Sequence, residues 1–112
     1  MDKENTKVYD LEERTKEFAN GCRFLVRGLL MDIPNREDGK QLVRASGSVA
    51  ANYIEANESL SKKDFIYRIK ICRKESKESR LWLNLLTVEL DQKELRNTWF
   101  RKLMSYLKYS LQ

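Results

Sequence analysis

The chain has 112 residues, which suits one domain, and it carries 41% hydrophobic and 35% charged residues with a net charge of +5. It contains no His, one Pro, four Gly and two Cys. These counts exclude His-dependent nucleophiles, His-ligated metals and a disulfide framework within one chain. Scarce turn residues and many long polar side chains favour an all-α, non-enzymatic protein that needs no cofactor.

The positive charge is unevenly distributed along the chain. Residues 1–40 have a formal net charge of −1, whereas residues 41–112 have one of +6. This excess suits an anionic partner such as nucleic acid, but it also suits a role in solubility alone, and the charge leaves both interpretations open. No apolar run approaches the roughly 18–20 residues of a membrane span, and the charged N-terminus does not resemble a signal peptide. We therefore expect a cytoplasmic protein with reduced thiols.

Two helices are predicted in the first half of the chain. The first covers residues 10–31, with Asp10 as its N-cap, and ends at the breaker sequence DIPN. The apolar residues of its buried face recur at helical spacing: Leu11, Phe18, Cys22, Leu25 and Leu29. The second covers residues 36–58, has a slim centre of small residues, and carries a similar face: Leu42, Ala45, Val49, Tyr53 and Ala56.

Two further helices are predicted in the second half. The third opens with the capping box Ser61-x-x-Asp64 and covers residues 62–90. Its core face comprises Phe65, Ile69, Cys72, Ser76, Ser79, Leu83 and Leu90. The fourth covers residues 93–110. Four helices joined by short links predict a single domain over residues 1–112, folded as an antiparallel up-down-up-down four-helix bundle.

The third predicted helix has a basic face without acids. Its members are Lys63, Lys70, Arg73, Lys74, Lys77 and Arg80. They extend over about 25 Å of helix, so they could follow a phosphate backbone in RNA or DNA through electrostatic, nonspecific contacts. The alternative is a solvated face that only confers solubility. No base-reading motif, aromatic platform for RNA or Gly-rich phosphate loop accompanies these residues.

A second apolar sector lies on another side of the same helix. It comprises Tyr67, Ile71, Trp82 and Leu85, with Glu75 and Glu78 beside them. One bundle needs about one apolar stripe per helix, so this sector is a candidate surface for homo-oligomerisation. The alternative is a wide core stripe on a central helix. The two acids could pair with Arg44, with Arg68 or with a basic residue of a neighbouring copy.

Other candidate residues offer little chemistry. Cys22 and Cys72 occupy core positions and are expected to be buried hydrophobic side chains. Glu75 and Glu78 lack the His partners of di-iron bundles, so no metal site and no catalytic residue is predicted. Asn52 and Glu55 could form a buried polar pair or part of an interface, and their spacing does not decide between these roles.

Three segments resemble one known family in the same order and spacing. They are YDLEERTKEFA at residues 9–19, QLVRASGSVAANYIEA at residues 41–56, and SKKDF followed by RIKICRKESKESRLWL between residues 61 and 83. Together they are similar to the signature of the four helix bundle protein family, also called the 23S ribosomal RNA intervening-sequence protein family. The fourth predicted helix carries little of this signature.

The resemblance implies a left-handed antiparallel four-helix bundle that assembles as a homopentamer. Some members are encoded in insertions within bacterial 23S ribosomal RNA genes, which explains the family name. A distant relative, the accessory protein of diversity-generating retroelements, is a basic pentamer that engages a reverse transcriptase and nucleic acid. The resemblance implies no enzymatic activity and no catalytic residues. The expected partners are therefore further copies of the chain and, through phosphate contacts, RNA or DNA, with a purely structural or adaptor assembly as the alternative.

Overall fold

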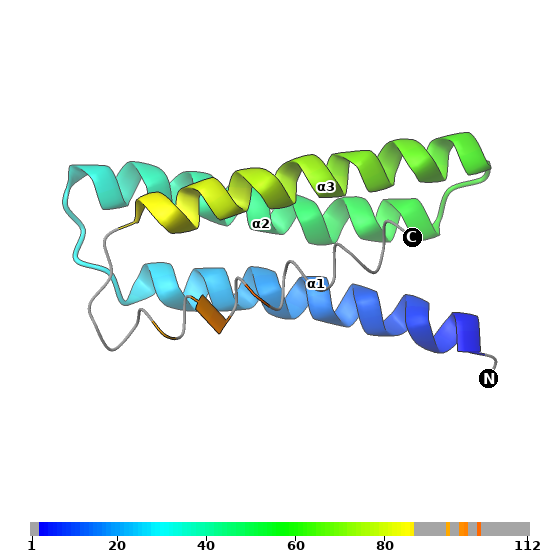
Figure 1. Cartoon of the computed structure of the whole chain (residues 1–112), viewed down its shortest axis with the longest axis horizontal. Coiled ribbons are helices and arrows are strands. Elements are labelled where there is room, and N and C mark those ends of the chain that lie inside the picture. The colour runs from blue at the N-terminus through cyan, green and yellow to red at the C-terminus, as the bar shows by residue number, and fades with distance from the viewer. Residues whose placement is uncertain (1–2, 87–93, 95–96, 99–100, 102–112) are drawn as a thin grey trace.

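Three helices make up the part of the chain that the computed structural model describes, which is residues 3–86 with 94, 97, 98 and 101, and side chains from residue 11 onward. They are α1 (Lys3–Arg27), α2 (Ile33–Asn57) and α3 (Lys62–Leu85). Consecutive helices run in opposite directions, and α2 packs against both of the others (Figure 1). The described chain is all-α and contains no strand. None of its helices is long and apolar enough to cross a membrane.

The bounds of α1 differ from the predicted 10–31. The helix begins at Lys3, so Asp10 lies inside it and the predicted N-cap is wrong. Residues 3–9 contain no Gly or Pro, and nothing in them stops a helix from extending toward the N-terminus. At the other end, Gly28 follows the last helical residue, Arg27, and its N–H bonds to the carbonyl of Leu25 at 3.1 Å in a tightened last turn.

The predicted breaker between the first two helices is in fact the start of α2. Asp32 is the N-cap, and its Oδ1 accepts a hydrogen bond from the N–H of Asn35 at 2.9 Å. Pro34 lies in the first turn, where its missing N–H costs no helical hydrogen bond. The helix therefore begins at Ile33, three residues before the predicted start, and it ends at Asn57, one residue before the predicted end.

The start of α3 confirms the N-cap half of the predicted capping box. Ser61 is the N-cap, and its Oγ accepts from the N–H of Asp64 at 3.1 Å. The helix ends at Leu85 because Leu86 adopts an extended backbone with φ −65° and ψ 135°. Residues 87–90 of the predicted third helix, and nearly all of the predicted fourth helix at 93–110, lie outside the described residues.

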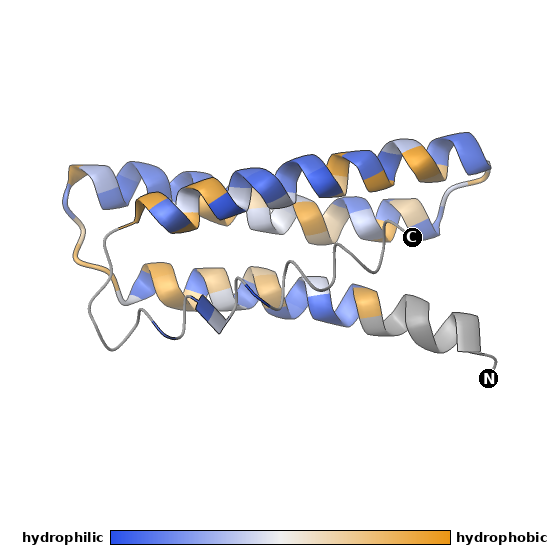
Figure 2. Ribbon diagram, viewed as in Figure 1, coloured by the Kyte–Doolittle hydropathy of each residue, from blue (hydrophilic) through white to orange (hydrophobic). Residues whose placement is uncertain are grey.

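The core consists of two groups of buried side chains along α2. Near the α1–α2 connection, α1, α2 and α3 together bury Phe18, Cys22, Leu25, Leu29, Leu42, Leu83 and Leu86. Nearer the α2–α3 connection, they bury Leu11, Tyr53, Ala56, Ile69 and Cys72. Apolar residues line the facing sides of the helices, as Figure 2 shows. The apolar faces predicted for the first two helices are all buried.

Small side chains let the helices approach closely. Ser46 on α2 and Ser76 and Ser79 on α3 are fully buried, and the hydroxyls of the latter two donate to the carbonyls of Cys72 and Glu75. Gly39 on α2 lies close to α1, since a Cβ there would lie 3.2 Å from Cγ1 of Val26, which would have to shift by a few tenths of an ångström. Of the small residues at the centre of the second predicted helix that lie outside its apolar face, Ser46 is the one that is fully buried.

One predicted core residue of α3 is not buried. Phe65 is 40% exposed, although it shares a helix face with Ile69 and Cys72, which are buried. It lies in the first turn of α3, beside the α2–α3 connection, where the helix pair ends. The apolar face of α3 therefore extends beyond the part of the helix that is buried in the core. Leu90, also predicted in the core, lies outside the described residues.

Candidate functional site

The six cations predicted to share one face of α3 form the basic ridge of this protein: Lys63, Lys70, Arg73, Lys74, Lys77 and Arg80. All six are exposed. They follow α3 from its first turn into its second half. A helix rises about 1.5 Å per residue, so the basic ridge is about 25 Å long.

The acids in the middle of α3 face away from the basic ridge, toward α2. Arg44 of α2 lies between them, with its guanidinium nitrogens 3.7 Å from Oε2 of Glu75 and 3.7 Å from Oε2 of Glu78. This contact confirms one of the pairings that the sequence left open. Both carboxylates thus lie close to a cation of α2, and Glu75 also experiences the positive charge of Lys74, its neighbour on the basic ridge.

Glu75 is an unusually buried member of this cluster. Its side chain is 10% exposed, and its Oε2 accepts no hydrogen bond from a described residue. Burial, with a smaller contribution from the negative charge of Glu78, raises the pKa of the Glu75 carboxyl above its ordinary value, while Arg44 opposes the rise. The ionised carboxylate is therefore less favourable in the folded protein than in the unfolded chain.

Replacing Glu75 with glutamine should consequently stabilise the protein at neutral pH. Below the unfolded-state pKa of about 4.5 the Glu75 carboxyl is protonated in both the folded and the unfolded chain, so burial costs no stability. Above the raised folded-state pKa the carboxyl is ionised in both states, and the full cost of burying its charge lowers the free energy of unfolding. The free energy of unfolding of Glu75→Gln should therefore equal that of the parent at pH 4 and exceed it at pH 7, as measured by urea denaturation. Glu58→Gln, which removes the same charge at an exposed position, is the matched control. A Glu75→Gln protein less stable than the parent at pH 7 would mean that attraction to Arg44 outweighs burial.

The six residues of the predicted oligomer surface have different environments. Tyr67 and Leu85 are 60% and 52% exposed and lie near opposite ends of α3. Between them, Glu75 and Glu78 contact Arg44, and the half-buried Trp82 packs against the core near the α1–α2 connection. Ile71 is also half-buried. Glu75, Glu78 and Trp82, in the middle of this sector, thus make contacts within the chain, and the role of the sector in oligomerisation stays a prediction.

Asn52 links α2 to α3, a role that its spacing from Glu55 did not reveal. Its side-chain nitrogen donates to the carbonyl and the hydroxyl of Ser48, and its Oδ1 accepts from Arg68 Nη1 at 3.0 Å. The guanidinium of Arg68 also lies over the ring of Tyr67, 5.8 Å from the ring centroid. Asn52 therefore fixes Arg68, and Arg68 in turn supports one face of the Tyr67 ring.

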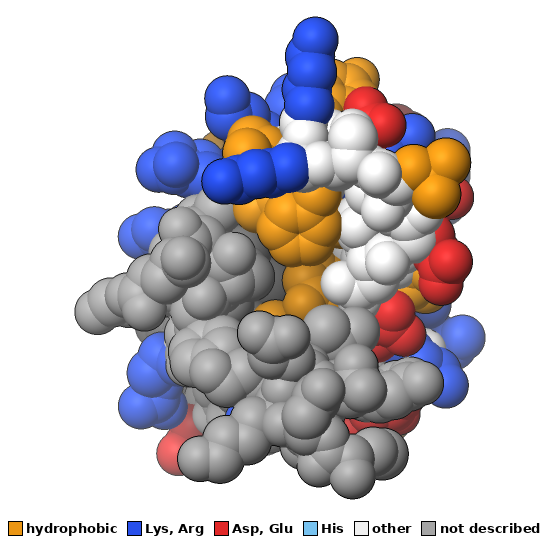
Figure 3. Space-filling model, turned by 90° about the vertical axis from the view of Figure 1, so that its right-hand side faces the viewer, with side chains coloured by type: hydrophobic (Ala, Val, Ile, Leu, Met, Phe, Trp, Pro, Cys, Tyr) orange, Lys and Arg blue, Asp and Glu red, His pale blue; other side chains and the backbone are white. Residues whose placement is uncertain are grey.

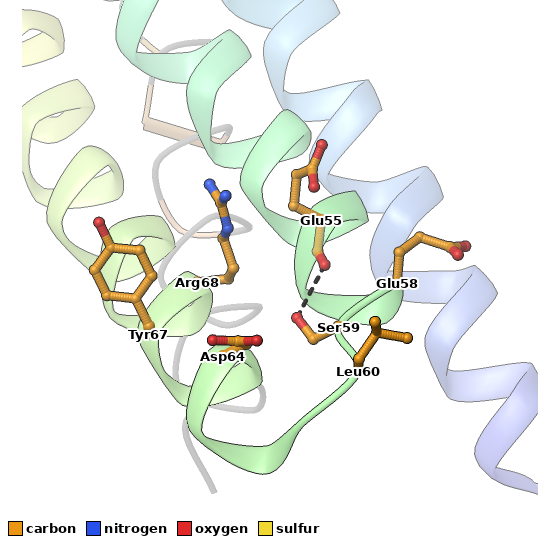
Figure 4. Close-up of a pocket in the computed structure, with 7 residues that line it drawn as sticks. All are labelled: Glu55, Glu58, Ser59, Leu60, Asp64, Tyr67 and Arg68. Carbon is orange, nitrogen blue, oxygen red and sulfur yellow. Dashed lines mark hydrogen bonds between the residues drawn. The ribbon is translucent and has the colours of Figure 1, made fainter.

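Two surface hollows adjoin Tyr67. One, of about 350 Å³, is lined by Glu55, Glu58, Ser59, Leu60, Asp64, Tyr67 and Arg68 at the α2–α3 connection (Figure 4). The other, of about 490 Å³, is lined by Lys62, Lys63, Ile66, Tyr67 and Lys70. Tyr67 thus lies between an acidic hollow and a basic one. Sequence periodicity did not single out Lys62 and Ile66, although Lys62, Ile66 and Lys70 follow one another at i, i+4 spacing.

The two cysteines and the clusters of acidic residues are the other groups that the sequence offers for chemistry. Cys22 and Cys72 are buried free thiols, as predicted, and burial raises their pKa values to about 12 and about 11. Protonated thiols at these values are poor nucleophiles at neutral pH. The residues that the structure describes include no group of three or more His, Cys, Asp or Glu side chains arranged to hold a metal ion.

These features define a small all-α protein of closely packed helices with a strongly basic helix face. The chain belongs to the 23S rRNA-intervening sequence protein family, whose model matches residues 26–108. A crystal structure of a protein of unknown function from the S23 ribosomal protein family of Bacteroides thetaiotaomicron VPI-5482 is similar, with 27% sequence identity and a TM-score of 0.71. The similarity covers 91% of this chain and 92% of that one. No curated protein matches the chain.

Proposed function

We propose that this protein is a non-enzymatic accessory factor that binds RNA or DNA nonspecifically through the phosphate backbone. The observation that carries the proposal is the basic ridge, six exposed cations on one face of a straight helix. Phosphates in duplex DNA follow one another closely along the helix axis, so a linear row of cations about 25 Å long can contact several of them. The family name records an association with intervening sequences, and the proposal does not depend on it.

The proposed contacts are electrostatic. Lys and Arg side chains on phosphates supply affinity and orientation, but they do not distinguish one base sequence from another. Six cations stand on this face against the two acids Glu75 and Glu78, both of which pair with Arg44 of α2, so a net positive potential along the ridge is expected.

Fluorescence anisotropy with generic labelled RNA and duplex DNA tests this proposal. Binding should be measurable at about 50 mM salt, where the electrostatic contribution is strong, and it should weaken steeply as salt is added. Similar affinities for unrelated sequences are expected. The absence of binding to either nucleic acid at the lowest salt would refute the proposed function.

A second candidate function is self-association into a structural or adaptor assembly. At the end of the molecule where α1 meets α2 and α3 stops, large apolar side chains are exposed: Leu30, Met31, Ile33, Leu81 and Leu85. Clusters of this kind are typical of protein–protein surfaces. We propose that the complete chain forms an antiparallel, left-handed four-helix bundle and that copies associate through this end, with five copies as the family resemblance implies.

Multi-angle light scattering tests the self-association. A mass several times the 13.3 kDa of one chain is expected at micromolar concentration. A monomer under these conditions would refute the assembly. An assembly that binds no nucleic acid would instead favour the structural role, because repeated ridges in one assembly should strengthen weak contacts.

A further inference from the structure

The basic hollow beside Tyr67 differs from the rest of the basic ridge because it contains exposed apolar surface. Ile66 is 42% exposed and Tyr67 is 60% exposed, and both belong to the first two turns of α3. Lys62, Lys63 and Lys70 complete the lining. Figure 3 shows this end of the molecule, where apolar side chains gather centrally with Lys and Arg side chains mainly on one side.

The Tyr67 ring has a cation near one of its faces. Arg68 lies over it, and Arg68 is anchored by its hydrogen bond to Oδ1 of Asn52 on α2. Tyr67 also lines the hollow that Lys62, Lys63, Ile66 and Lys70 form. An aromatic ring that is supported on one side and solvent-exposed on the rest can stack with a planar ligand.

The charges around the hollow indicate what that ligand carries. Three lysines line it, two of which, Lys63 and Lys70, belong to the basic ridge. The carboxylates near Tyr67, those of Glu55, Glu58 and Asp64, line the separate hollow that also contains Arg68. A flat, apolar group attached to phosphates fits this combination of a ring, an isoleucine and lysines. An unpaired nucleobase in a nucleic-acid strand has these properties, and aromatic stacking with basic side chains is how single strands are bound without sequence preference.

We infer that the hollow formed by Ile66 and Tyr67 accepts an unpaired base of a strand whose phosphates lie on the basic ridge. The protein therefore prefers single-stranded RNA or DNA to a duplex of the same length. This inference rests on the proposed nucleic-acid binding and specifies its substrate. In a duplex the bases are paired and stacked on one another, so a duplex reaches the lysines but not the ring.

The test compares a 12-nucleotide single strand with a 12-base-pair duplex by fluorescence anisotropy at one salt concentration. The parent should bind the single strand more tightly. Tyr67→Ala should weaken single-strand binding by about tenfold and leave duplex binding unchanged. Tyr67→Phe is the matched control, because it keeps the ring, and it should retain the preference. Circular dichroism should show the same helix content for all three proteins.

The possible outcomes separate this inference from the proposed function. A parent that binds neither probe at about 50 mM salt refutes both, since electrostatic contacts are strong there. A parent that binds both probes equally, or a Tyr67→Ala protein that keeps its preference, refutes only the base-stacking role. If Tyr67→Ala weakens binding to both probes in parallel and lowers the mass in light scattering, Tyr67 belongs to an oligomer interface and the inference is also refuted.

Discussion

Replacing Phe18 with alanine is expected to lower the free energy of unfolding by about 3–5 kcal/mol, the range found for fully buried aromatic residues. Phe18 is 0% exposed and belongs to the one buried group that α1, α2 and α3 share near the α1–α2 connection. Its neighbours Leu25, Leu42 and Leu83 are also nearly inaccessible, and they cannot collapse into the space without moving a helix. The loss of stability therefore includes the cost of the cavity as well as the lost burial of apolar surface. Urea denaturation followed by circular dichroism measures the difference.

Phe24→Ala is the matched control for this prediction. Phe24 lies on the same helix and loses the same atoms, but it is 64% exposed, so its replacement should change stability by about 0.5 kcal/mol or less. Because a small protein can lose its fold altogether on a change of this size, Phe18→Leu provides a milder second variant, expected to cost about 1.5 kcal/mol or less. Equal effects of Phe18→Ala and Phe24→Ala would contradict the arrangement of α1 on the other helices.

The buried helix faces could be predicted from the sequence because packing repeats the helical period. Phe18, Cys22 and Leu25 follow one another at the spacing that a single face requires, and each is buried. Helix ends depend on weaker local preferences. The sequence DIPN contains the strongest breaker in the chain, but Asp32 caps α2 and Pro34 lies in its first turn, so the same residues start a helix that they were expected to precede.

The contacts of the candidate site were predictable only in part. The pairing of Arg44 with Glu75 could be anticipated because both residues have long side chains and lie at the edges of the apolar faces of their helices. The support of Tyr67 by Arg68 and Asn52 could not, because it depends on how far α3 is rotated and shifted along α2. On a helical wheel of α3, Tyr67 belongs to a different sector from the basic ridge. On the protein surface, however, Tyr67 lines one hollow together with Ile66 and the ridge residues Lys63 and Lys70.

Replacing Arg73, Lys74 and Lys77 together with alanine should weaken duplex binding by about a thousandfold at about 50 mM salt. These three residues form the middle of the basic ridge, are exposed, and lie at least three residues beyond the hollow beside Tyr67. Each phosphate contact contributes about −0.9 to the slope of log affinity against log salt concentration. The parent, with six contacts, should therefore show a slope of about −5, and the triple variant one of about −3.

The control for this experiment removes the same charge from other helices. Lys16, Arg27 and Arg36 are exposed on α1 and α2, outside the basic ridge, and their joint replacement with alanine also removes three positive charges. If net charge alone attracts nucleic acid, both triple variants should lose affinity and slope equally, and the ridge would have no special role. If the ridge binds the phosphates, the control should keep nearly the whole slope of the parent, because charges away from the contact are largely screened beyond about 10 Å at 0.1 M salt. The difference between the two slopes thus counts the phosphate contacts that the middle of α3 makes.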